Sequence, residues 1–322
     1  MSVASDPVHA NRSASSGAGR VAILLSTFEG AKYLRQQLAS LSAQTHREWH
    51  LFWRDDGSTD ETCAILDDFA NAGQATRVAR DQRRLGVLGS FMELLELAPD
   101  DYDYFAFCDQ DDVWFPDKLS RAVDRLRGVL PDRPGLYCAR QTLVNRDLVP
   151  IGASPAPRRA MGFRNALVQN IVTGCTIVMN AAARRVVWDA PRPPAGTFHD
   201  WWCYICISGA GGELLFDPAP ALYYRQHAAN VVGATGMLER AKRAVARGAG
   251  PFLQQLGEHL TALADDRSLT SENTATVGLL DALSHNSAWE RWRVLRAAKL
   301  YRQTALEDVL MYLWIGLGPV PR

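Results

Sequence analysis

Short apolar runs alternate with amphipathic segments from residue 20 to about residue 130. The runs are rich in β-branched and aromatic side chains, as in buried strands, and lie at residues 20–28, 49–53, 77–80 and 102–108. Between them, apolar positions recur at helical spacing, and Pro116 suits the first turn of a further helix. This alternation predicts an α/β fold, a mostly parallel central sheet with helices on both faces.

The second half of the chain is less regular. Strands are expected at 136–144, 173–180 and 214–224, with a helix beginning near His199. From about residue 237 onward, helix-forming residues and arginines dominate. We therefore divide the chain into a disordered N-terminal lead over 1–19, an α/β domain over 20–235 and a C-terminal helical extension over 236–322.

The composition is balanced in charge, so any electrostatic function must come from local groups of residues. The 322 residues are 47% hydrophobic and 22% charged, and 35 basic residues balance 35 acidic ones, so no global charge favours nucleic acid. The N-terminus has no signal-peptide core, and no apolar run is long enough to span a bilayer. Cys203 and Cys206 lie in the apolar segment WWCYICISG, which favours burial over a redox or metal role. Single thiols in apolar surroundings fit a cytoplasmic protein.

Two acidic clusters follow predicted strands, where ligands bind in open α/β sheets. Asp55 and Asp56 follow one strand, and Asp109, Asp111 and Asp112 follow another. If the second cluster stays extended, Asp109 and Asp111 point to one side and Asp112 to the other. Paired carboxylates suit Mg²⁺ or Mn²⁺. The alternative is that they cap the next helix, which is most plausible for Asp112.

Three segments in this order, STFEGAKYLRQQLASLSAQ, DDGSTDET and FCDQDDVWFPDKL, resemble the inverting family-two glycosyltransferases of GT-A fold over about residues 20–230. The versions CDQDDVW, GCTIVMN, HDWW and YRQHAANVVG are most similar to bacterial rhamnosyltransferases of O-antigen and surface polysaccharide synthesis. The resemblance implies a nucleotide-diphosphate sugar donor, with dTDP-L-rhamnose expected. It also implies an oligosaccharide or lipid-linked acceptor and a Mg²⁺ or Mn²⁺ cofactor.

The resemblance also implies roles for particular residues. Those expected to bind the nucleotide sugar are Ser26, Thr27, Phe28, Glu29, Asp56, Asp109, Gln110 and Arg225. The expected metal ligands are Asp109, Asp111 and His227, although a lone histidine is also compatible with a structural role. No chemistry beyond packing is expected of Cys175.

Inversion at the sugar needs a base for the acceptor hydroxyl, and HDWW offers Asp200 at the start of a predicted helix. The alternative makes Asp200 the N-cap of that helix. His199, Trp201 and Trp202 are the expected acceptor contacts, against simple core packing for Trp201. Neighbouring tryptophans could raise the pKa of the base and stack on sugar rings.

The extension joins five basic residues between 290 and 302 to a nine-residue apolar stretch, Val309–Leu317. This pattern predicts peripheral contact with an anionic membrane, and a helical cap or a homodimer contact are the alternatives. For the whole chain, the alternatives are another donor such as a UDP-hexose, a sugar nucleotidyltransferase, or a non-catalytic nucleotide-sugar-binding subunit.

Overall fold

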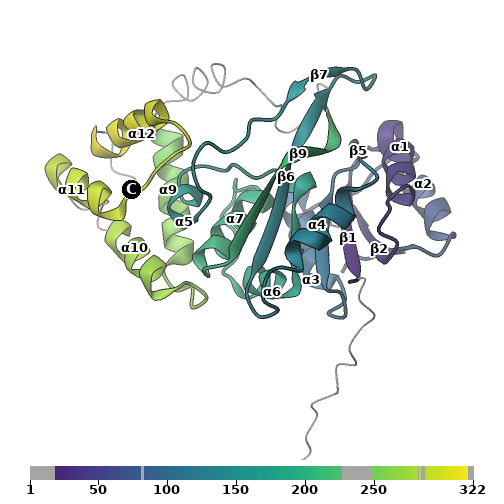
Figure 1. The fold of residues 1–322 in the computed structure, drawn as a ribbon, viewed down its shortest axis with the longest axis horizontal. Helices are drawn as coiled ribbons and strands as arrows, with labels where there is room; N and C mark the ends of the chain where they lie inside the picture. The colour runs from purple at the N-terminus through teal and green to yellow at the C-terminus, as the bar shows by residue number, and fades with distance from the viewer. Residues whose placement is uncertain (1–18, 81–82, 227–248, 282, 284–286, 318–322) are drawn as a thin grey trace, which may run out of the picture.

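The computed structural model describes residues 19–80, 83–226, 249–281, 283 and 287–317. Its centre is one twisted sheet, and the first half of the chain forms the parallel part of that sheet (Figure 1). The strands β1 (Val21–Thr27), β2 (Trp49–Asp55), β3 (Ala75–Arg77) and β4 (Tyr104–Cys108) lie in the order β3-β2-β1-β4, all parallel. The parallel sheet predicted from the alternating pattern is confirmed.

Beyond β4 the sheet becomes mixed. It continues through β8 (Val178–Asn180), β6 (Gly135–Val144), β9 (Glu213–Arg225) and the short β5 (Val113–Trp114), with β7 (Pro150–Ala153) paired to β6. β8 runs antiparallel to both β4 and β6. The strand expected over 173–180 is only partly correct, because Gly174–Thr176 form a 3₁₀ turn, η1, in which Thr176 N bonds Thr173 O.

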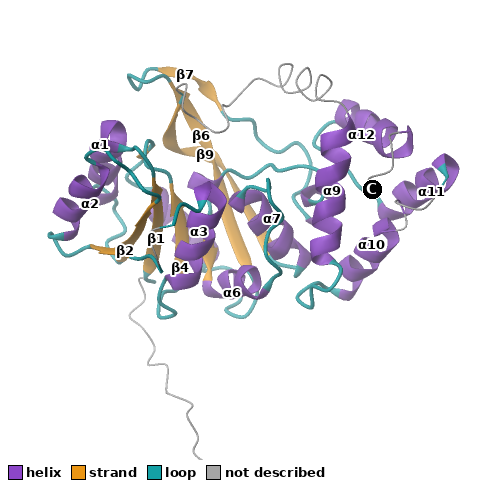
Figure 2. Ribbon diagram, turned by 180° about the vertical axis from the view of Figure 1, so that it is seen from behind, coloured by secondary structure: helices purple, strands orange, loops and turns teal. Residues whose placement is uncertain are grey.

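Helices cover both faces of the sheet, and the strands supply side chains to each face alternately. In β1, Val21, Ile23 and Leu25 pack in one core, whereas Ala22 and Leu24 pack in the other. The first core includes residues of α1 (Ala31–Ser42), α2 (Thr62–Ala70) and α4 (Lys118–Leu126). The second includes residues of α3 (Gly86–Leu97), α5 (Phe163–Ala166), α6 (Ala181–Asp189) and α7 (His199–Gly209) (Figure 2).

The C-terminal helices pack on the second core rather than standing apart from it. They are α9 (Ala249–Leu263), α10 (Ser271–Asp281), α11 (Ala288–Ala298) and α12 (Ala305–Leu317). Their buried residues belong to the same apolar cluster as α3 and α7, and Gln303 Oε1 accepts bonds from the backbone N–H groups of Arg158 (2.8 Å) and Arg159 (2.9 Å). The extension is therefore a packed cap, while the expected boundary at 235/236 lies outside the described residues. Within the described part, no helix combines the length and apolarity needed to cross a bilayer.

Candidate active site

The ends of β1 and β2 are joined by the loop that follows β2. The Asp55 carboxylate accepts bonds from Gly57 N (3.0 Å), Ser58 N (2.8 Å) and Thr27 Oγ1 (3.0 Å). Although burial acts in the opposite direction, these bonds hold the pKa of Asp55 below its usual value. Gly57 has φ 91°, a left-handed conformation that glycine adopts without strain. Asp55 thus fixes the turn and keeps its negative charge.

The segment after β1 is held from two sides. Glu29 has φ 48°, and its carboxylate accepts bonds from Thr59 N (2.8 Å) and Thr59 Oγ1 (2.9 Å). From the β4 side, the Gln110 amide pairs with Phe28, accepting from its N–H (2.8 Å) and donating to its carbonyl (2.9 Å). A side chain at Gly30 would collide with this amide. Phe28 and Glu29, both predicted to bind the nucleotide, are therefore held by the predicted site residue Gln110 and by the loop after β2, respectively.

Asp56 lies beneath the start of α3. Its buried carboxylate pairs with Arg54 Nη1 (2.6 Å) and accepts bonds from Leu85 N (2.6 Å) and Gly86 N (2.9 Å). Burial opposes ionisation, but these bonds and the arginine hold the pKa of Asp56 below its usual value. The structure therefore places Asp56 in a positioning network that anchors α3, and its contact with a nucleotide stays a prediction.

The second acidic cluster does not have the expected alternation. The chain bends at Gln110 and Asp111 instead of staying extended, so the expectation that Asp112 points away from Asp109 is wrong. One carboxylate oxygen from each of Asp109 and Asp112 and the Cys175 sulfur all lie within 4.8 Å of one another. The thiol for which no chemistry was expected thus faces both carboxylates.

The crowded carboxylates of this cluster, of which Asp112 is buried and Asp109 half-buried, disfavour one another's ionisation. Asp112 is completely buried; its Oδ1 accepts a bond from Arg225 N (3.3 Å), and its Oδ2 has no hydrogen-bond partner. Burial, together with Asp111 and Asp109, raises the pKa of Asp112 well above its usual value. Burial also raises the pKa of Asp109 to about 7, with further contributions from Asp111 and Asp200. Lys118 Nζ, buried 3.3 Å from the centre of the Trp114 ring, has its pKa lowered to about 8 by burial.

The chemistry of this cluster suits a divalent cation. Crowded carboxylates with raised pKa values and an orphan buried oxygen on Asp112 are stabilised by positive charge. The carboxylates provide hard oxygen ligands, and Cys175 adds a softer one. Asp111 lies close enough to raise the pKa of both other aspartates, although Asp109, Asp112 and Cys175 form the compact set. The predicted ligand His227 lies outside the described residues.

Arg225 ties this cluster to the rest of the fold. Its side chain is buried, donates from Nε to Asp111 O (2.9 Å) and from Nη2 to Gln36 Oε1 (2.6 Å), and lies over the Tyr33 ring. The guanidinium also bonds Arg146 O. These contacts hold Asp111 and Asp112 in place, and the predicted contact of Arg225 with the nucleotide sugar stays a prediction.

Asp200 lies in the first turn of α7, whose N-cap is Phe198, so the alternative that Asp200 is the N-cap is wrong. Its Oδ1 accepts bonds from Asn170 Nδ2 (3.0 Å) and Trp201 N (2.6 Å), and its Oδ2 from Gly174 N (3.0 Å). Burial raises the pKa of Asp200 to about 6, against the opposing effect of these bonds. A carboxyl group with this pKa is ionised at neutral pH and can accept a proton.

Turn η1 brings Asp200 and the acidic cluster together. Gly174 donates its N–H to Asp200, and the next residue, Cys175, lies against Asp109 and Asp112. The charge of Asp200 in turn raises the pKa of Asp109. The structure thus brings Asp200 near the carboxylates of Asp109 and Asp112.

Two of the three acceptor contacts predicted from sequence, His199 and Trp202, are buried. Trp202 is completely buried. His199 is nearly so; it stacks on Phe91 at 4.1 Å between ring centroids, and burial lowers its pKa to about 3. Neither side chain offers a surface to an acceptor, which disagrees with the prediction. Trp201 is half-buried and donates from Nε1 to Ala166 O (2.6 Å).

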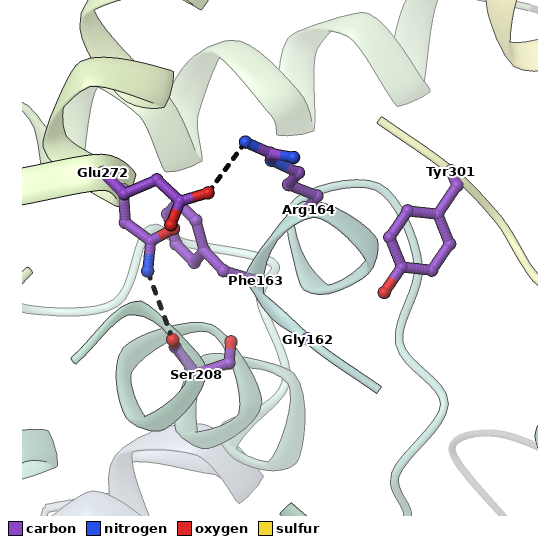
Figure 3. A pocket seen from close by; sticks show the side chains of 7 residues that line it. Gly162, Phe163, Arg164, Ser208, Glu272 and Tyr301 are labelled. Carbon is purple, nitrogen blue, oxygen red and sulfur yellow. Dashed lines mark hydrogen bonds and ion pairs between the residues drawn. The ribbon is translucent and has the colours of Figure 1, made fainter. Parts of the chain in front are cut away.

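A separate pocket lies at the junction with the C-terminal helices (Figure 3). It has a volume of about 290 Å³ and is lined by α5, the end of α7, the start of α10 and Tyr301. An ion pair between Arg164 and Glu272 (3.0 Å) crosses its rim. None of the site residues described above lines this pocket. The candidate active site is therefore the set of carboxylates at the strand ends, and not this pocket.

The fold is that of the GT-A glycosyltransferases, and the comparisons with known proteins agree with this class. The chain belongs to glycosyl transferase family 2, whose family model matches residues 22–188. Among solved structures it is similar to TarS of S. aureus in complex with UDP-GlcNAc (TM-score 0.56, 13% identity, 94% of this chain and 82% of that one). It is also similar to the mannosyltransferase PcManGT of Pyrobaculum calidifontis in complex with GDP-Man and Mn2+ (TM-score 0.52, 16% identity, 92% and 85%).

Two curated relatives carry more specific names. The dTDP-rhamnosyl transferase RfbG of Shigella flexneri is 26% identical over 227 residues, which cover 65% of this chain and 74% of that protein. The Escherichia coli UDP-Glc:alpha-D-GlcNAc-diphosphoundecaprenol beta-1,3-glucosyltransferase WfgD is 23% identical over 159 residues, 49% of this chain. This chain spans 59% of the length of WfgD. These relatives differ in donor, so family membership alone does not define the sugar.

Proposed function

We propose that this protein transfers a sugar, with inversion, from a nucleoside-diphosphate donor to a hydroxyl of an oligosaccharide or lipid-linked acceptor in surface polysaccharide synthesis. The observation that carries the proposal is the approach of Asp200 to the Asp109–Asp112 group through η1. The preferred donor is dTDP-L-rhamnose, supported by the likeness to RfbG. A lipid-linked acceptor is supported by the diphosphoundecaprenol-linked sugar in the name of WfgD.

In this reaction the Asp200 carboxylate accepts the acceptor proton as the hydroxyl oxygen bonds to the anomeric carbon. The bond from that carbon to the phosphate oxygen breaks, and the nucleoside diphosphate leaves with the electron pair. Asn170 and Gly174 orient the base through their hydrogen bonds. Gln110 holds the Phe28 segment against which the nucleotide is expected to bind.

A Mg²⁺ or Mn²⁺ ion held by Asp109, with Asp111 or Asp112, would stabilise the negative charge of the departing diphosphate. Support comes from the compact donor set and from the Mn2+ named with PcManGT. The residues on this chain supply a preformed negative site, and Arg225 holds Asp111 and Asp112 in place.

Asp111→Ala tests metal dependence. Removing this carboxylate should abolish turnover and remove the Mn²⁺-dependent part of nucleotide affinity, measured by thermal shift with dTDP, UDP and GDP sugars in parallel. Asp124→Ala is the matched control, because Asp124 is an exposed acid on α4 that pairs with Arg127 (2.8 Å). Full activity of Asp111→Ala in excess EDTA would refute the metal role, and no shift with any of these sugars would refute the donor class.

A further inference from the structure

Helix α12 carries its acidic residues toward the protein and apolar residues toward the outside. Glu307 accepts a bond from Gln169 Nε2 (3.1 Å), and Asp308 pairs with Arg159 and accepts from Arg302 N (2.6 Å). The outward side chains are largely exposed: Leu306 at 73%, Val309 at 57% and Leu313 at 42%. A surface helix in water normally has the opposite arrangement, with its charges outside.

The exposed residues recur at helical spacing and form one stripe. Positions 306, 309 and 313 lie at i, i+3 and i+7, on one side of a helix. The opposite side buries Met311 and Ile315 in the core, so the stripe is a second apolar face rather than the edge of the first.

The adjacent helix α11 adds an aromatic residue and positive charge. Trp289 is 74% exposed, and Arg293, Arg296 and Lys299 are exposed toward the end of the helix. The rings of Trp292 and Tyr312 lie 5.9 Å apart, so the two helices pack side by side.

The structure refines which residues of the tail are available at the surface. Arg291 is buried and donates to Ile315 O (3.5 Å), so it is removed from the basic group expected from sequence. On the same helix, the exposed Glu290 accepts a bond from Ser287 N (3.0 Å) in a capping box, so its carboxylate is paired with the N-terminus of α11.

We propose that the outer face of α11 and α12, formed by Trp289, Arg293, Arg296, Leu306, Val309 and Leu313, binds the surface of an anionic lipid bilayer. Exposed apolar side chains bury into the boundary between headgroups and acyl chains, a tryptophan suits the headgroup level, and nearby basic residues are attracted to anionic lipid. A symmetric contact with a second copy would instead place two positively charged copies of this face against each other, and like charges repel. Charge therefore favours lipid as the occupant.

Flotation of the full chain tests this directly. Vesicles of phosphatidylglycerol mixed with phosphatidylcholine should carry the protein upward, pure phosphatidylcholine should carry much less, and high salt should weaken the binding. Replacing all three stripe residues, by Leu306→Ser, Val309→Ser and Leu313→Ser, should reduce the bound fraction at least about tenfold, because apolar insertion is lost. Arg293→Gln with Arg296→Gln should reduce it severalfold and flatten the salt dependence.

A matched control uses three apolar residues that are equally exposed elsewhere: Leu130→Ser, Val149→Ser and Ile151→Ser. These should leave flotation unchanged. All the replaced side chains are exposed, and thermal melts of each variant establish that the fold is intact. Equal loss in the control, or no flotation of the intact chain with anionic vesicles, would overturn the proposal. So would a stripe variant whose main effect is to convert a dimer into a monomer in light scattering, because that result assigns the face to a second copy.

Discussion

Removing the Asn170 amide is expected to move the pH dependence of catalysis without removing the base. Burial raises the pKa of Asp200 to about 6, and the bond from Asn170 Nδ2 (3.0 Å) acts in the opposite direction because it stabilises the charged form. Asp200 must be ionised to accept a proton, so turnover should rise with pH through about 6 and then level off. Asn170→Ala removes one stabilising bond and should raise that midpoint.

The size of the shift follows from the strength of the bond. A hydrogen bond to a charged group contributes roughly 1.5–3 kcal/mol, and about 1.4 kcal/mol corresponds to one pKa unit. Asp200 is only partly buried in the fold, and water can replace the amide, so we expect a shift of about 0.5–1 unit. For a full unit, turnover falls about fivefold at pH ~6 and hardly at all at pH ~8.

The assay is a pH–rate profile of sugar transfer at saturating donor, acceptor and metal. Asp200→Asn should lose the acid limb altogether and fall by ~10²–10⁴-fold, the usual contribution of a general base. Asn273→Ala is the matched control, since its amide bonds Gly209 O (2.8 Å) at the other end of the same helix. An unchanged midpoint in Asn170→Ala, or near-normal turnover of Asp200→Asn, would refute this assignment of the base.

Two further predictions concern the neighbouring groups. Burial raises the pKa of Asp112 above its value in the unfolded chain, so the native state retains a proton and loses stability as pH rises above ~4. Asp112→Asn keeps the acceptor for Arg225 N. It should therefore raise the Tm of the metal-free protein by at least ~2 °C at high pH and leave the Tm at low pH unchanged. An equal or lower Tm at high pH would contradict the destabilising effect of a buried charge. Gln110→Ala removes both bonds to Phe28 and should weaken nucleotide binding, measured by calorimetry, about fivefold. Gln74→Ala, at an exposed position outside the site, is the control. Equal nucleotide affinity in the two variants would refute the role of Gln110 in holding the Phe28 segment.

The sequence predicted the elements that depend on periodicity and failed where distant segments meet. Helix α3 (Gly86–Leu97) lies between two predicted strands, where helical spacing of apolar positions was expected, because this spacing is set locally. The orientation of Asp112 was wrong because it rested on an extended backbone, whereas the chain bends at Gln110 and Asp111. Cys175 lies more than sixty residues from these aspartates along the chain, and no local pattern could bring it to them.

Helical geometry could have corrected the acceptor residues. His199 and Trp202 are three apart in α7, so both lie on one side of the helix, and that side is buried. Asp200 and Trp201 lie on the more exposed side. The spacing of these residues within HDWW therefore separates His199 and Trp202 from Asp200 and Trp201, whereas their chemical type does not.

The link through η1 makes the charges of the site interdependent. In the absence of a cation, Asp200 raises the pKa of Asp109, and Asp109 opposes the ionisation of Asp200 in turn. Positive charge at Asp109 would relieve this repulsion and lower the pKa of the base, since a bound cation is the largest local charge in such a site. Ionisation of Asp200 and occupation of the carboxylate group therefore favour each other. The midpoint of the pH–rate profile therefore depends on the charge at Asp109, whereas the contribution of the Asn170 hydrogen bond does not. For this reason the effect of Asn170→Ala must be measured as the difference in midpoint from wild type at one fixed metal concentration.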